Sequence, residues 1–327
     1  MVYSFEECSS IVEKQIEELH IGLSMPERLY EPVAYMLARG GKRIRPALTL
    51  MSCNLFDDNV QKALMPAVAV EVFHNFTLIH DDLMDNADVR RNSPTVHRKW
   101  SGNTAILSGD AMQTLAYRYL FRAPAKLLPA LLDVFSGTAL AVCEGQQYDM
   151  DFESDDSVTL EAYRRMIELK TAALIAASLH IGAICGGAGQ QDIEALHRWG
   201  LALGMAFQIQ DDRLDMYGDP AIFGKAVGGD ILEEKKTYLL LMALQTADSA
   251  TRADLLSLLH NRALPPEERI GRIKAIYDRL KINEKVKQVI DNYRIESIQL
   301  LQKVNLPDNS RKKALENLSA MLFERNK

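Results

Sequence analysis

Apolar residues recur at helical spacing along almost the whole chain, and this pattern limits the folds open to it. One such run carries Leu64, Val68, Val72, Phe76 and Ile79 on one face of a helix. Sustained alternation of apolar and polar residues is absent from the sequence, as are the Asn-Gly and Asp-Gly pairs that mark tight hairpins. The pattern predicts an all-α chain of ten or more helices.

No Gly/Ser-rich or Pro-rich linker interrupts the helical pattern. Prolines fall where helices are expected to begin or break: Pro26, Pro46, Pro94, Pro124, Pro220, Pro265, Pro266 and Pro307. A length of 327 residues suggests two domains, although one large architecture also reaches this size. Because no linker is found, we expect one domain over residues 1–327, a large helical bundle whose core holds a ligand site.

The composition excludes several classes of protein. With 38 Lys and Arg against 44 Asp and Glu, the chain lacks the positive charge that nucleic-acid binding requires. The first residues, MVYSFEECSS, show no basic stretch followed by an apolar one, and the most apolar stretch, residues 172–188, is interrupted by His180 and glycines. We expect a cytoplasmic protein with no nucleic-acid partner and no integral membrane segment. Its separated cysteines are predicted to be buried thiols: Cys8, Cys53, Cys143 and Cys185.

Two similar acidic motifs, FTLIHDDLMD and FQIQDDRLD, each place Asp-Asp-x-x-Asp after an apolar helical run. In a helix the first and last aspartates lie one turn apart on one face, and the middle one lies about 100° round. Like charges at this spacing destabilise a helix, so each motif needs a cation, and carboxylates suit Mg²⁺ shared with substrate phosphates. A solvated acidic helix end is the alternative, but two copies make it a poor explanation. The predicted metal ligands are Asp81, Asp82, Asp85, Asp211 and Asp215, and Asp212 is a further predicted catalytic residue.

Basic residues gather near both motifs and could bind phosphate oxygens. One group lies in ARGGKRIRP, which is not a P-loop because the GK[ST] ending is missing. Each such residue alone is more often a solvated surface charge, so the prediction of phosphate binding depends on several of them occurring together. The candidates are Lys42, Arg43, Arg45, Arg90, Arg91, Lys170 and Lys225.

The chain resembles the isoprenyl (polyprenyl) diphosphate synthases over nearly its whole length. The resemblance is carried by GGKRIRP, HNFTLIHDDLMDNADVRR, Lys170-Thr171, FQIQDDRLD, GKAVGGD and the basic end ERNK. It implies a helical bundle around a central cavity, usually in a homodimer, with three Mg²⁺ ions joining the aspartate motifs to an allylic diphosphate. Asn92, Ala172 and Glu234 depart from the glycine that is common at these positions of the family, and Leu239 departs from its proline.

Site roles also follow from the resemblance. Asp81, Asp85 and Asp211 are similar to the principal metal ligands, and Asp82, Asp212 and Asp215 to direct, water-mediated or supporting partners. The allylic diphosphate is expected at Arg90, Lys170, Thr171, Gln208 and Lys225. The pocket for isopentenyl diphosphate is expected at Lys42, Arg45, His74 and Arg91, although His74 alone could be a packed helix residue.

The implied reaction is ionisation, condensation and elimination. Mg²⁺ and basic residues stabilise the departing diphosphate, Lys170 and Thr171 stabilise the allylic cation, and a proton leaves to the released pyrophosphate. Residues upstream of Asp81 are expected to close the cavity floor: Phe73, Phe76 and Thr77. Aromatics there resemble enzymes that make the C20 product geranylgeranyl diphosphate, with C15 farnesyl diphosphate next, although ordinary core phenylalanines are an alternative.

Three other classes compete with this interpretation, besides a synthase of longer polyprenyl chains. A class I terpene cyclase shares the fold, but its second metal motif usually carries Asn, Ser and Glu rather than a repeated DDxxD. A metal phosphohydrolase suggested by His80-Asp81 would need further spaced histidines, and the chain has seven. A catalytically silent partner subunit would be expected to have lost aspartates or arginines, all of which are present here.

Overall fold

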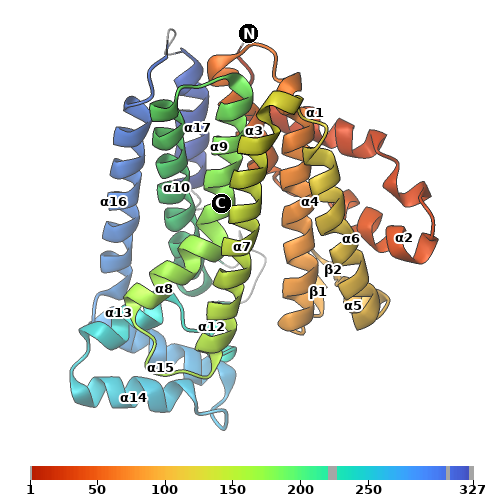
Figure 1. Ribbon diagram of the computed structural model, residues 1–327. Coiled ribbons are helices and arrows are strands. Elements are labelled where there is room, and N and C mark those ends of the chain that lie inside the picture. Colours follow the sequence, from red (N-terminus) through yellow and green to blue (C-terminus); the bar gives the residue numbers. More distant parts are fainter. Residues whose placement is uncertain (1, 220–226, 307–309, 324–327) are drawn as a thin grey trace. The chain divides into compact units, whose positions relative to one another are not determined.

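The computed structural model describes residues 2–219, 227–306 and 310–323 (Figure 1). Helices make up nearly all the regular structure of these residues, which confirms the all-α prediction. The chain forms two compact units, each built from separated stretches of sequence. The first unit contains residues 1–137, 177–197 and 304–315, and the second contains 138–176, 198–303 and 316–327. The prediction of one domain over residues 1–327 stays a prediction.

The first unit is built around α4, which runs beside α3 and α6 (Figure 1). Almost every residue between Ala67 and Phe76 is buried, because helices cover α4 on several sides. The elements that lie wholly in this unit are α1 (Phe5–Glu18), η1 (Ile21–Leu23), α2 (Glu27–Ala38), α3 (Ile44–Phe56), α4 (Gln61–Met84), β1 (Val89–Arg90), β2 (Ser93–Pro94), α5 (Val96–Lys99), α6 (Gly102–Leu120) and η2 (Ala125–Leu127).

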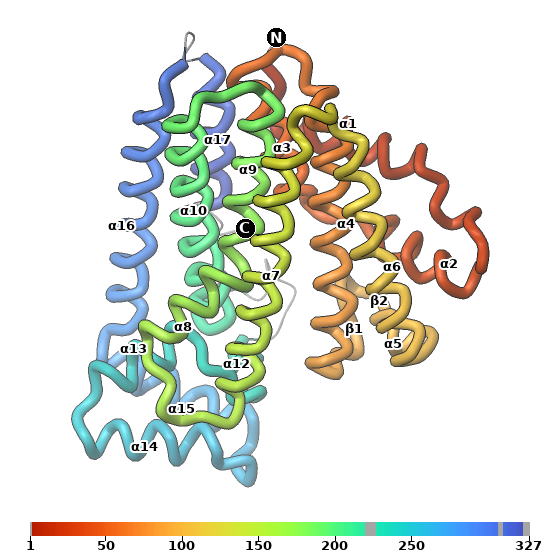
Figure 2. The backbone as a smooth tube through the Cα atoms, in the orientation of Figure 1, coloured from red at the N-terminus to blue at the C-terminus, as the bar shows by residue number. Residues whose placement is uncertain are grey.

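The second unit holds a second buried core, in which α14 and α15 pack together at one end (Figure 2). Its own elements are α8 (Leu160–Ile167), the π-helix η3 (Glu168–Ala172), α12 (Gly229–Leu232), α13 (Tyr238–Thr246), α14 (Ser249–Leu259), α15 (Pro266–Arg279) and α16 (Ile282–Gln302). Four helices contribute residues to both units: α7 (Leu128–Glu153), α9 (Ala173–Gly186), α10 (Gln190–Tyr217) and α17 (Ser310–Phe323).

Side-chain caps explain where several helices begin. Ser4 and Glu7 form a reciprocal capping box at α1, and Ser101 accepts a hydrogen bond from the Thr104 amide at α6. In the second unit Thr237 caps α13 in the same way. Pro265 and Pro266 begin α15 as predicted, because proline suits a position whose amide has no helical partner. Pro220 and Pro307 lie outside the described residues.

A small hairpin interrupts the helices after α4 and was not predicted from the sequence. Strands β1 and β2 pair antiparallel, with Arg90 opposite Ser93. The two turn residues, Arg91 and Asn92, both have left-handed backbone angles, with φ of 50° and 57°. Such a pair makes a tight hairpin turn, and Asn92 adopts this conformation readily where glycine is common in the family.

Three stretches are long and apolar enough to cross a membrane by length and composition: residues 61–84, 125–153 and 160–186. Their most apolar windows are 72%, 22% and 67% buried, so the first and third behave as core helices. The four cysteines are free thiols, and Cys8, Cys53 and Cys185 are buried as predicted. Cys143 was predicted wrongly, because it lies on an exposed face of α7.

Candidate active site

The first aspartate motif lies at the C-terminal end of α4. Asp81 and Asp82 belong to its last turn, and Asp85 is the C-cap residue. The free carbonyl groups at a helix C-terminus carry partial negative charge, so carboxylates are unfavourable there. The last turn of α4 holds no basic residue. The end of this helix therefore favours a cation held from outside the helix.

The first two aspartates of this motif have different surroundings. Asp82 is 1% exposed, and its Oδ1 accepts a hydrogen bond from Arg90 Nε over 2.6 Å. Arg90 Nη2 lies farther from Asp81 Oδ2, at 3.6 Å. Burial raises the pKa of Asp82, and the Asp82 Oδ2 atom is buried without a hydrogen-bond partner among the described residues. Asp82 thus holds Arg90 through Oδ1, and its Oδ2 can still bind a ligand. Asp85, by contrast, is exposed.

The ARGGKRIRP segment and the hairpin lie against each other in the first unit. Arg91 Nη1 donates a hydrogen bond to the Gly40 carbonyl, and a Cβ on Gly41 would lie 2.8 Å from Arg91 Nη2. Gly41 has a φ of 131°, so glycine provides both the backbone conformation and the space for the guanidinium. Lys42 is exposed beside this contact. Two segments about fifty residues apart therefore join into one basic surface.

Arg45 and His74 form the inner part of this surface. Arg45 Nη1 lies 3.2 Å from His74 Nε2. Since a guanidinium only donates, His74 Nε2 is the acceptor and the ring is neutral. Burial and the charges of Arg45, Arg91, Arg90 and Arg43 hold the pKa of His74 well below its usual value. His74 therefore positions Arg45 rather than adding positive charge.

Arg45 has the character of an anion-binding residue. Burial and the neighbouring Arg91 lower its pKa to about 10, although Glu71 acts in the opposite direction. Its Nε atom is buried without a hydrogen-bond partner among the described residues. A buried donor in an excess of positive charge is stabilised by an anion, and a diphosphate supplies several acceptor oxygens.

Arg43 has a different role from the one its sequence position suggests. Its side chain is buried and donates to Glu71 Oε1 over 2.5 Å and to Glu13 Oε2 over 2.9 Å. A further bond reaches the Leu37 carbonyl, and Glu71 also accepts from Asn75 Nδ2. Arg43 has a φ of 48°, so this buried network holds an unfavourable backbone conformation. Arg43 therefore stabilises the ARGGKRIRP loop, and its neighbours Lys42 and Arg45 can bind a ligand.

The second aspartate motif repeats the arrangement of the first. Asp211, Asp212 and Asp215 lie near the C-terminal end of α10, whose last turn carries no basic residue. Asp212 is buried, whereas Asp211 and Asp215 are partly exposed. In both motifs the second aspartate is thus the buried one, because it projects about 100° round the helix from the one-turn pair and faces the packed side.

Asp212 is held by three donors in the second unit. Its Oδ2 accepts from Tyr163 Oη over 2.6 Å and from the Tyr238 amide over 2.9 Å. Its Oδ1 accepts from Gln208 Nε2 over 3.0 Å. Burial raises the pKa of Asp212 to about 6, while the three hydrogen bonds oppose that rise. This carboxylate fixes the surroundings of the motif.

Asp215 is joined to the segment that begins at Val227. Its Oδ2 accepts from the Asp230 amide over 3.2 Å, and its carbonyl accepts from the Gly228 amide over 2.8 Å. Burial and the charges of Asp215 and Asp212 raise the pKa of Asp230 to about 7. Asp230 lies in the GKAVGGD segment but was not among the predicted site residues. A cation beside Asp215 would relieve this repulsion.

Lys170 and Thr171 lie in the π-helix η3, a local widening that is frequent at functional sites. Lys170 Nζ donates to Asp149 Oδ2 over 2.6 Å. Thr171 Oγ1 donates to Gln208 Oε1 over 3.2 Å, and Gln208 continues to Asp212. The structure therefore joins Thr171 and Gln208 to the second motif, whereas Lys170 pairs with Asp149. Ala172 packs against Gly204, where a Cβ would lie 2.7 Å from the Ala172 Cβ.

Mg²⁺ suits the donor set of both motifs. Mg²⁺ is commonly bound by one or two carboxylates together with substrate phosphates rather than by a complete protein cage. Among residues 2–219, 227–306 and 310–323, no three His, Cys, Asp or Glu side chains form a ready-made metal site. The buried Asp82 Oδ2 and the acidic helix ends are consistent with a cation that phosphates help to hold. Lys225 and the basic end ERNK lie outside the described residues.

The three predicted floor residues lie on α4 upstream of Asp81. Phe73 is 1% exposed and packs edge-on against Phe135, with ring centroids 5.4 Å apart. Phe76 is also buried and contacts the His80 ring at 4.8 Å. Thr77 is partly exposed, and its hydroxyl donates to the His74 carbonyl. Phe73 thus has a clear core role, and a floor role for the three stays a prediction.

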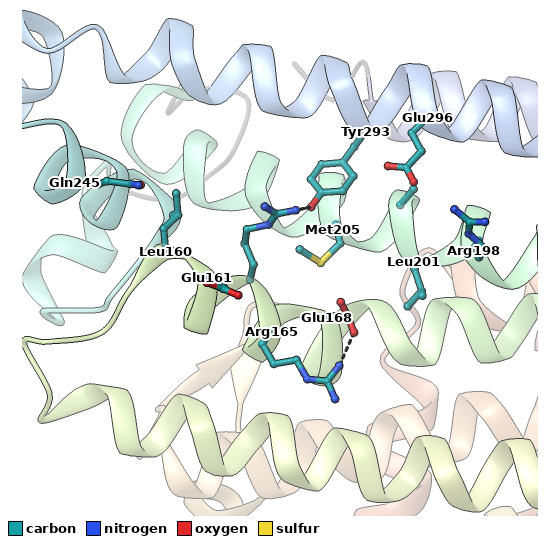
Figure 3. Close-up of a pocket in the computed structure, with 12 residues that line it drawn as sticks. Leu160, Glu161, Arg165, Glu168, Arg198, Leu201, Met205, Gln245, Tyr293 and Glu296 are labelled. Atoms are coloured by element: carbon teal, nitrogen blue, oxygen red, sulfur yellow. Dashed lines mark hydrogen bonds and ion pairs between the residues drawn. The ribbon is translucent and has the colours of Figure 1, made fainter.

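A groove of about 690 Å³ lies in the second unit and contains no predicted site residue (Figure 3). Its lining holds both arginines and glutamates, and Arg164 donates to Tyr293 Oη over 2.8 Å. Arg165 pairs with Glu168 at 2.5 Å. The charges of the lining balance, so the groove has no clear preference for an anion or a cation. Its other lining residues are Leu160, Glu161, Arg198, Leu201, Ala202, Met205, Gln245 and Glu296.

Sequence reasoning missed four residues that support the site: Glu71, Asp149, Tyr163 and Asp230. Asp230 could have been found, because it ends the GKAVGGD segment. Asp149 lies in an acidic stretch at the end of α7, but nothing in the sequence pairs it with Lys170. Tyr163 and Glu71 carry no local signal, since their roles depend on contacts between helices.

Comparison with known proteins agrees with this site. The family model described as Polyprenyl synthetase matches residues 26–280. The chain is 42% identical to the geranylgeranyl diphosphate synthase of Methanosarcina mazei over 240 residues, covering 72% of this chain and 74% of that protein. It is 42% identical to the short chain isoprenyl diphosphate synthase of Methanocaldococcus jannaschii, covering 79% of each.

The fold agrees as well. A crystal structure of geranylgeranyl pyrophosphate synthase matches with a TM-score of 0.93 at 39% identity, covering 99% of both chains. These findings confirm the resemblance that the aspartate motifs and the basic segment suggested. The chain belongs to the polyprenyl synthetase family of prenyl diphosphate synthases.

Proposed function

We propose that this protein condenses isopentenyl diphosphate with an allylic diphosphate of five to fifteen carbons and releases pyrophosphate. The product is geranylgeranyl diphosphate, with farnesyl diphosphate as the shorter alternative. The observation that carries the proposal is the placement of both aspartate motifs near the C-terminal ends of helices whose last turn holds no basic residue. The names of the relatives in Methanosarcina mazei and Methanocaldococcus jannaschii support the same reaction class.

The basic surface of the first unit suits the diphosphate of isopentenyl diphosphate. Arg45 offers its buried Nε, and Arg91 and Lys42 add charge at the edge of the same surface. His74 accepts from Arg45 and so orients the guanidinium. These residues bind and position the nucleophilic substrate, whose double bond supplies the electron pair for the new carbon–carbon bond.

The second motif and its neighbours suit the allylic diphosphate. The bond from C1 to the diphosphate oxygen breaks, and its electron pair leaves with the diphosphate. Lys170 and Gln208 are proposed to interact with that group, and the Thr171 hydroxyl oxygen to face the allylic carbon; the contact of Lys170 with Asp149 and that of Thr171 with Gln208 support these roles. The double bond of isopentenyl diphosphate then bonds to C1, and a proton leaves to the released pyrophosphate.

Mg²⁺ would be held by Asp81, Asp85, Asp211 and Asp215, with Asp82 Oδ2 as a further oxygen. When bound, Mg²⁺ neutralises charge on the departing diphosphate and acts as a Lewis acid. Three ions per site are expected from the family resemblance. Arg90 is fixed by Asp82 and stands ready to share the same diphosphate.

Phe73, Phe76 and Thr77 are proposed to set product length. Phe73 and Phe76 are bulky and buried on α4, and Thr77 lies four residues before Asp81 on the same face. Their position upstream of the motif supports a short product chain.

A homodimer is also proposed. The apolar run at residues 125–153 has only 22% of its most apolar window buried, and Leu140 on α7 is 62% exposed. A long exposed apolar helix face favours association with a second copy. We also propose a cytoplasmic location, in keeping with four free thiols.

Product analysis tests the function directly. Purified protein would be incubated with Mg²⁺, labelled isopentenyl diphosphate and, separately, C5, C10 and C15 allylic diphosphates. We expect a discrete C20 or C15 product that disappears with a chelator and with Asp81→Ala. Loss of allylic substrate without a labelled elongation product would refute the condensation and favour a cyclase or phosphohydrolase. Products beyond C20 would support a longer-chain synthase.

A further inference from the structure

Glu234 adopts a backbone conformation that is unusual for a residue with a Cβ. Its φ is 58°, in the left-handed region, and it follows Glu233, the C-cap residue of α12. The Glu234 amide donates to the Ile231 carbonyl over 3.1 Å, and the Lys235 amide donates to the Asp230 carbonyl over 2.9 Å. Glycine usually closes a helix in this way, because it adopts the conformation without steric conflict. A glutamate here calls for a compensating interaction of its side chain.

The Glu234 carboxylate has such an interaction with the segment that follows α14. It accepts from His260 Nδ1 over 2.9 Å and from Arg262 Nε over 2.6 Å. On the other side of the imidazole, His260 Nε2 lies 3.0 Å from Asp156 Oδ2, and Lys236 Nζ lies 2.8 Å from Asp156 Oδ1. These five residues, called the Glu234 clamp below, join the segments that follow α7, α12 and α14.

The clamp requires a charged histidine. A neutral imidazole carries one N–H, so only the imidazolium form donates to both Glu234 and Asp156. Hydrogen bonds to these two carboxylates raise the pKa of His260. The other charged groups that face this arrangement are Lys236 and Arg262, each bound to one of the same carboxylates. The clamp is complete below the His260 pKa and loses one hydrogen bond as pH rises through it.

The turn at Glu234 lies between two backbone amides that hold the second aspartate motif. Before it, the Asp230 amide donates to Asp215 Oδ2. After it, the Tyr238 amide donates to Asp212 Oδ2. Only three residues separate Glu234 from Tyr238, and a Thr237 to Lys235 backbone bond tightens that stretch. Fixing Glu234 therefore fixes both donors.

We propose that Glu234 is a positioning residue, which acts through His260 and Arg262 to hold the turn that orients the second aspartate motif toward its metal. This inference rests on the proposed function, since the motif needs orientation only if it binds Mg²⁺ and an allylic diphosphate. Glu234 itself touches neither. Its effect reaches Asp212 and Asp215 through the backbone.

Two readouts test the proposal, one of them independent of activity. Hydrogen–deuterium exchange followed by mass spectrometry would report the protection of residues 229–240, and steady-state assays would report the Mg²⁺ concentration for half-maximal rate. In Glu234→Gly we expect faster exchange and an increase of about tenfold in that Mg²⁺ concentration. The KM for isopentenyl diphosphate should not change, because its proposed residues lie in the first unit. Glycine relieves the backbone, so the variant is expected to fold.

Glu233→Ala is the matched control. Glu233 is the adjacent carboxylate, its side chain is 63% exposed, and it pairs with Lys235 at 2.7 Å. Both readouts should stay at their wild-type values in this variant. The proposal would be overturned if Glu234→Gly and Glu233→Ala gave the same exchange rates and the same Mg²⁺ requirement. The contacts of Glu234 with His260 and Arg262 would then have no specific effect on the motif.

The pH dependence adds a second arm. In the wild type, protection of residues 229–240 should decrease between pH 6 and 8 more than intrinsic exchange chemistry accounts for. His260→Gln should remove this dependence, since glutamine stays neutral. A pH dependence that survives in His260→Gln would overturn the role of the clamp. Absence of any prenyl product from the wild type would refute the proposed function, whereas the exchange results would still report on the clamp.

Discussion

The Tyr163 hydroxyl donates to Asp212 Oδ2 over 2.6 Å, so a tyrosine of α8 holds the middle aspartate of the second motif. The same carboxylate accepts from the Tyr238 amide and from Gln208. Asp212 is therefore committed to contacts within its unit, while Asp211 beside it is partly exposed. The two adjacent aspartates thus have different roles: Asp212 supports the structure of the unit, and Asp211 can bind a ligand.

This division predicts opposite phenotypes for two adjacent substitutions. Asp212→Ala removes a buried acceptor of three hydrogen bonds. We expect the free energy of unfolding to fall by about 1–3 kcal/mol and the melting temperature to fall by several degrees. Asp211→Ala should leave the melting temperature of the metal-free protein unchanged or slightly higher, because it removes charge from a helix C-terminus. It should lower kcat by about 10³-fold if Asp211 holds metal. Calorimetry and product assays measure the two effects. Equal loss of stability in both variants would contradict the division.

Tyr163→Phe tests the same contact by removing one hydroxyl. The change leaves a phenyl ring in place and deprives Asp212 of one of its three donors. We expect a loss of stability of about 1–2 kcal/mol and a higher Mg²⁺ requirement, because the motif loses part of its support. Tyr293→Phe is a suitable control, since its hydroxyl accepts from Arg164 in the groove of the same unit. A Mg²⁺ requirement that is the same in both variants would count against the role of Tyr163.

His74 should act as a neutral acceptor for Arg45 at every working pH. Glutamine can accept the same bond, so His74→Gln should keep the KM for isopentenyl diphosphate within about threefold of the wild type. His74→Leu removes the acceptor from a partly buried guanidinium, and we expect KM to rise by about tenfold or more. The KM of the wild type should not titrate with His74 between pH 6 and 8. A KM that rises equally in both variants would show that His74 contacts the substrate instead.

Two partly buried histidines of the first unit should make the protein sensitive to mild acid. Burial and the adjacent His197 lower the pKa of His180 to about 4, and burial lowers that of His197. In the unfolded chain both bind protons near pH 6.5, so the folded state loses stability as pH falls from about 6.5 toward 4. We expect the melting temperature to fall over this window and to fall less in His180→Gln. His20→Gln controls for the loss of a histidine. An identical pH slope in wild type and His180→Gln would refute the assignment.

Phe76→Ala should lengthen the product if this side chain closes the floor. Removing the ring beside His80 opens space upstream of Asp81, and we expect prenyl chains longer than C20 in chromatography of the products. Phe135→Ala is a matched control, because Phe135 contacts Phe73 but lies on another helix. An unchanged product in Phe76→Ala with intact activity would mean that Phe76 is a core residue only.

The sequence predicted the helical class and both aspartate motifs, since these depend on local spacing. It also identified Thr171 and Gln208, which the structure joins in one network with Asp212, and Lys170, which pairs with Asp149. It could not distinguish Asp82 and Asp212 from their neighbours, because burial depends on which helices pack against each side. The role of Arg43 was hidden for the same reason, as its partners Glu13 and Glu71 lie far away in the sequence. The hairpin was not predicted, because its turn residues are Arg91 and Asn92 rather than an Asn-Gly or Asp-Gly pair.

The placement of both acidic motifs near the C-terminal ends of α4 and α10 affects how stable the folded protein is with and without its ligands. Each helix end is less stable when it carries carboxylates alone and more stable when a cation and an anionic ligand occupy it. Ligands that bind only the folded state shift the unfolding equilibrium in proportion to their concentration. We therefore expect the chain to resist proteolysis best when its precursors are abundant, so that its abundance follows the supply of its own substrates.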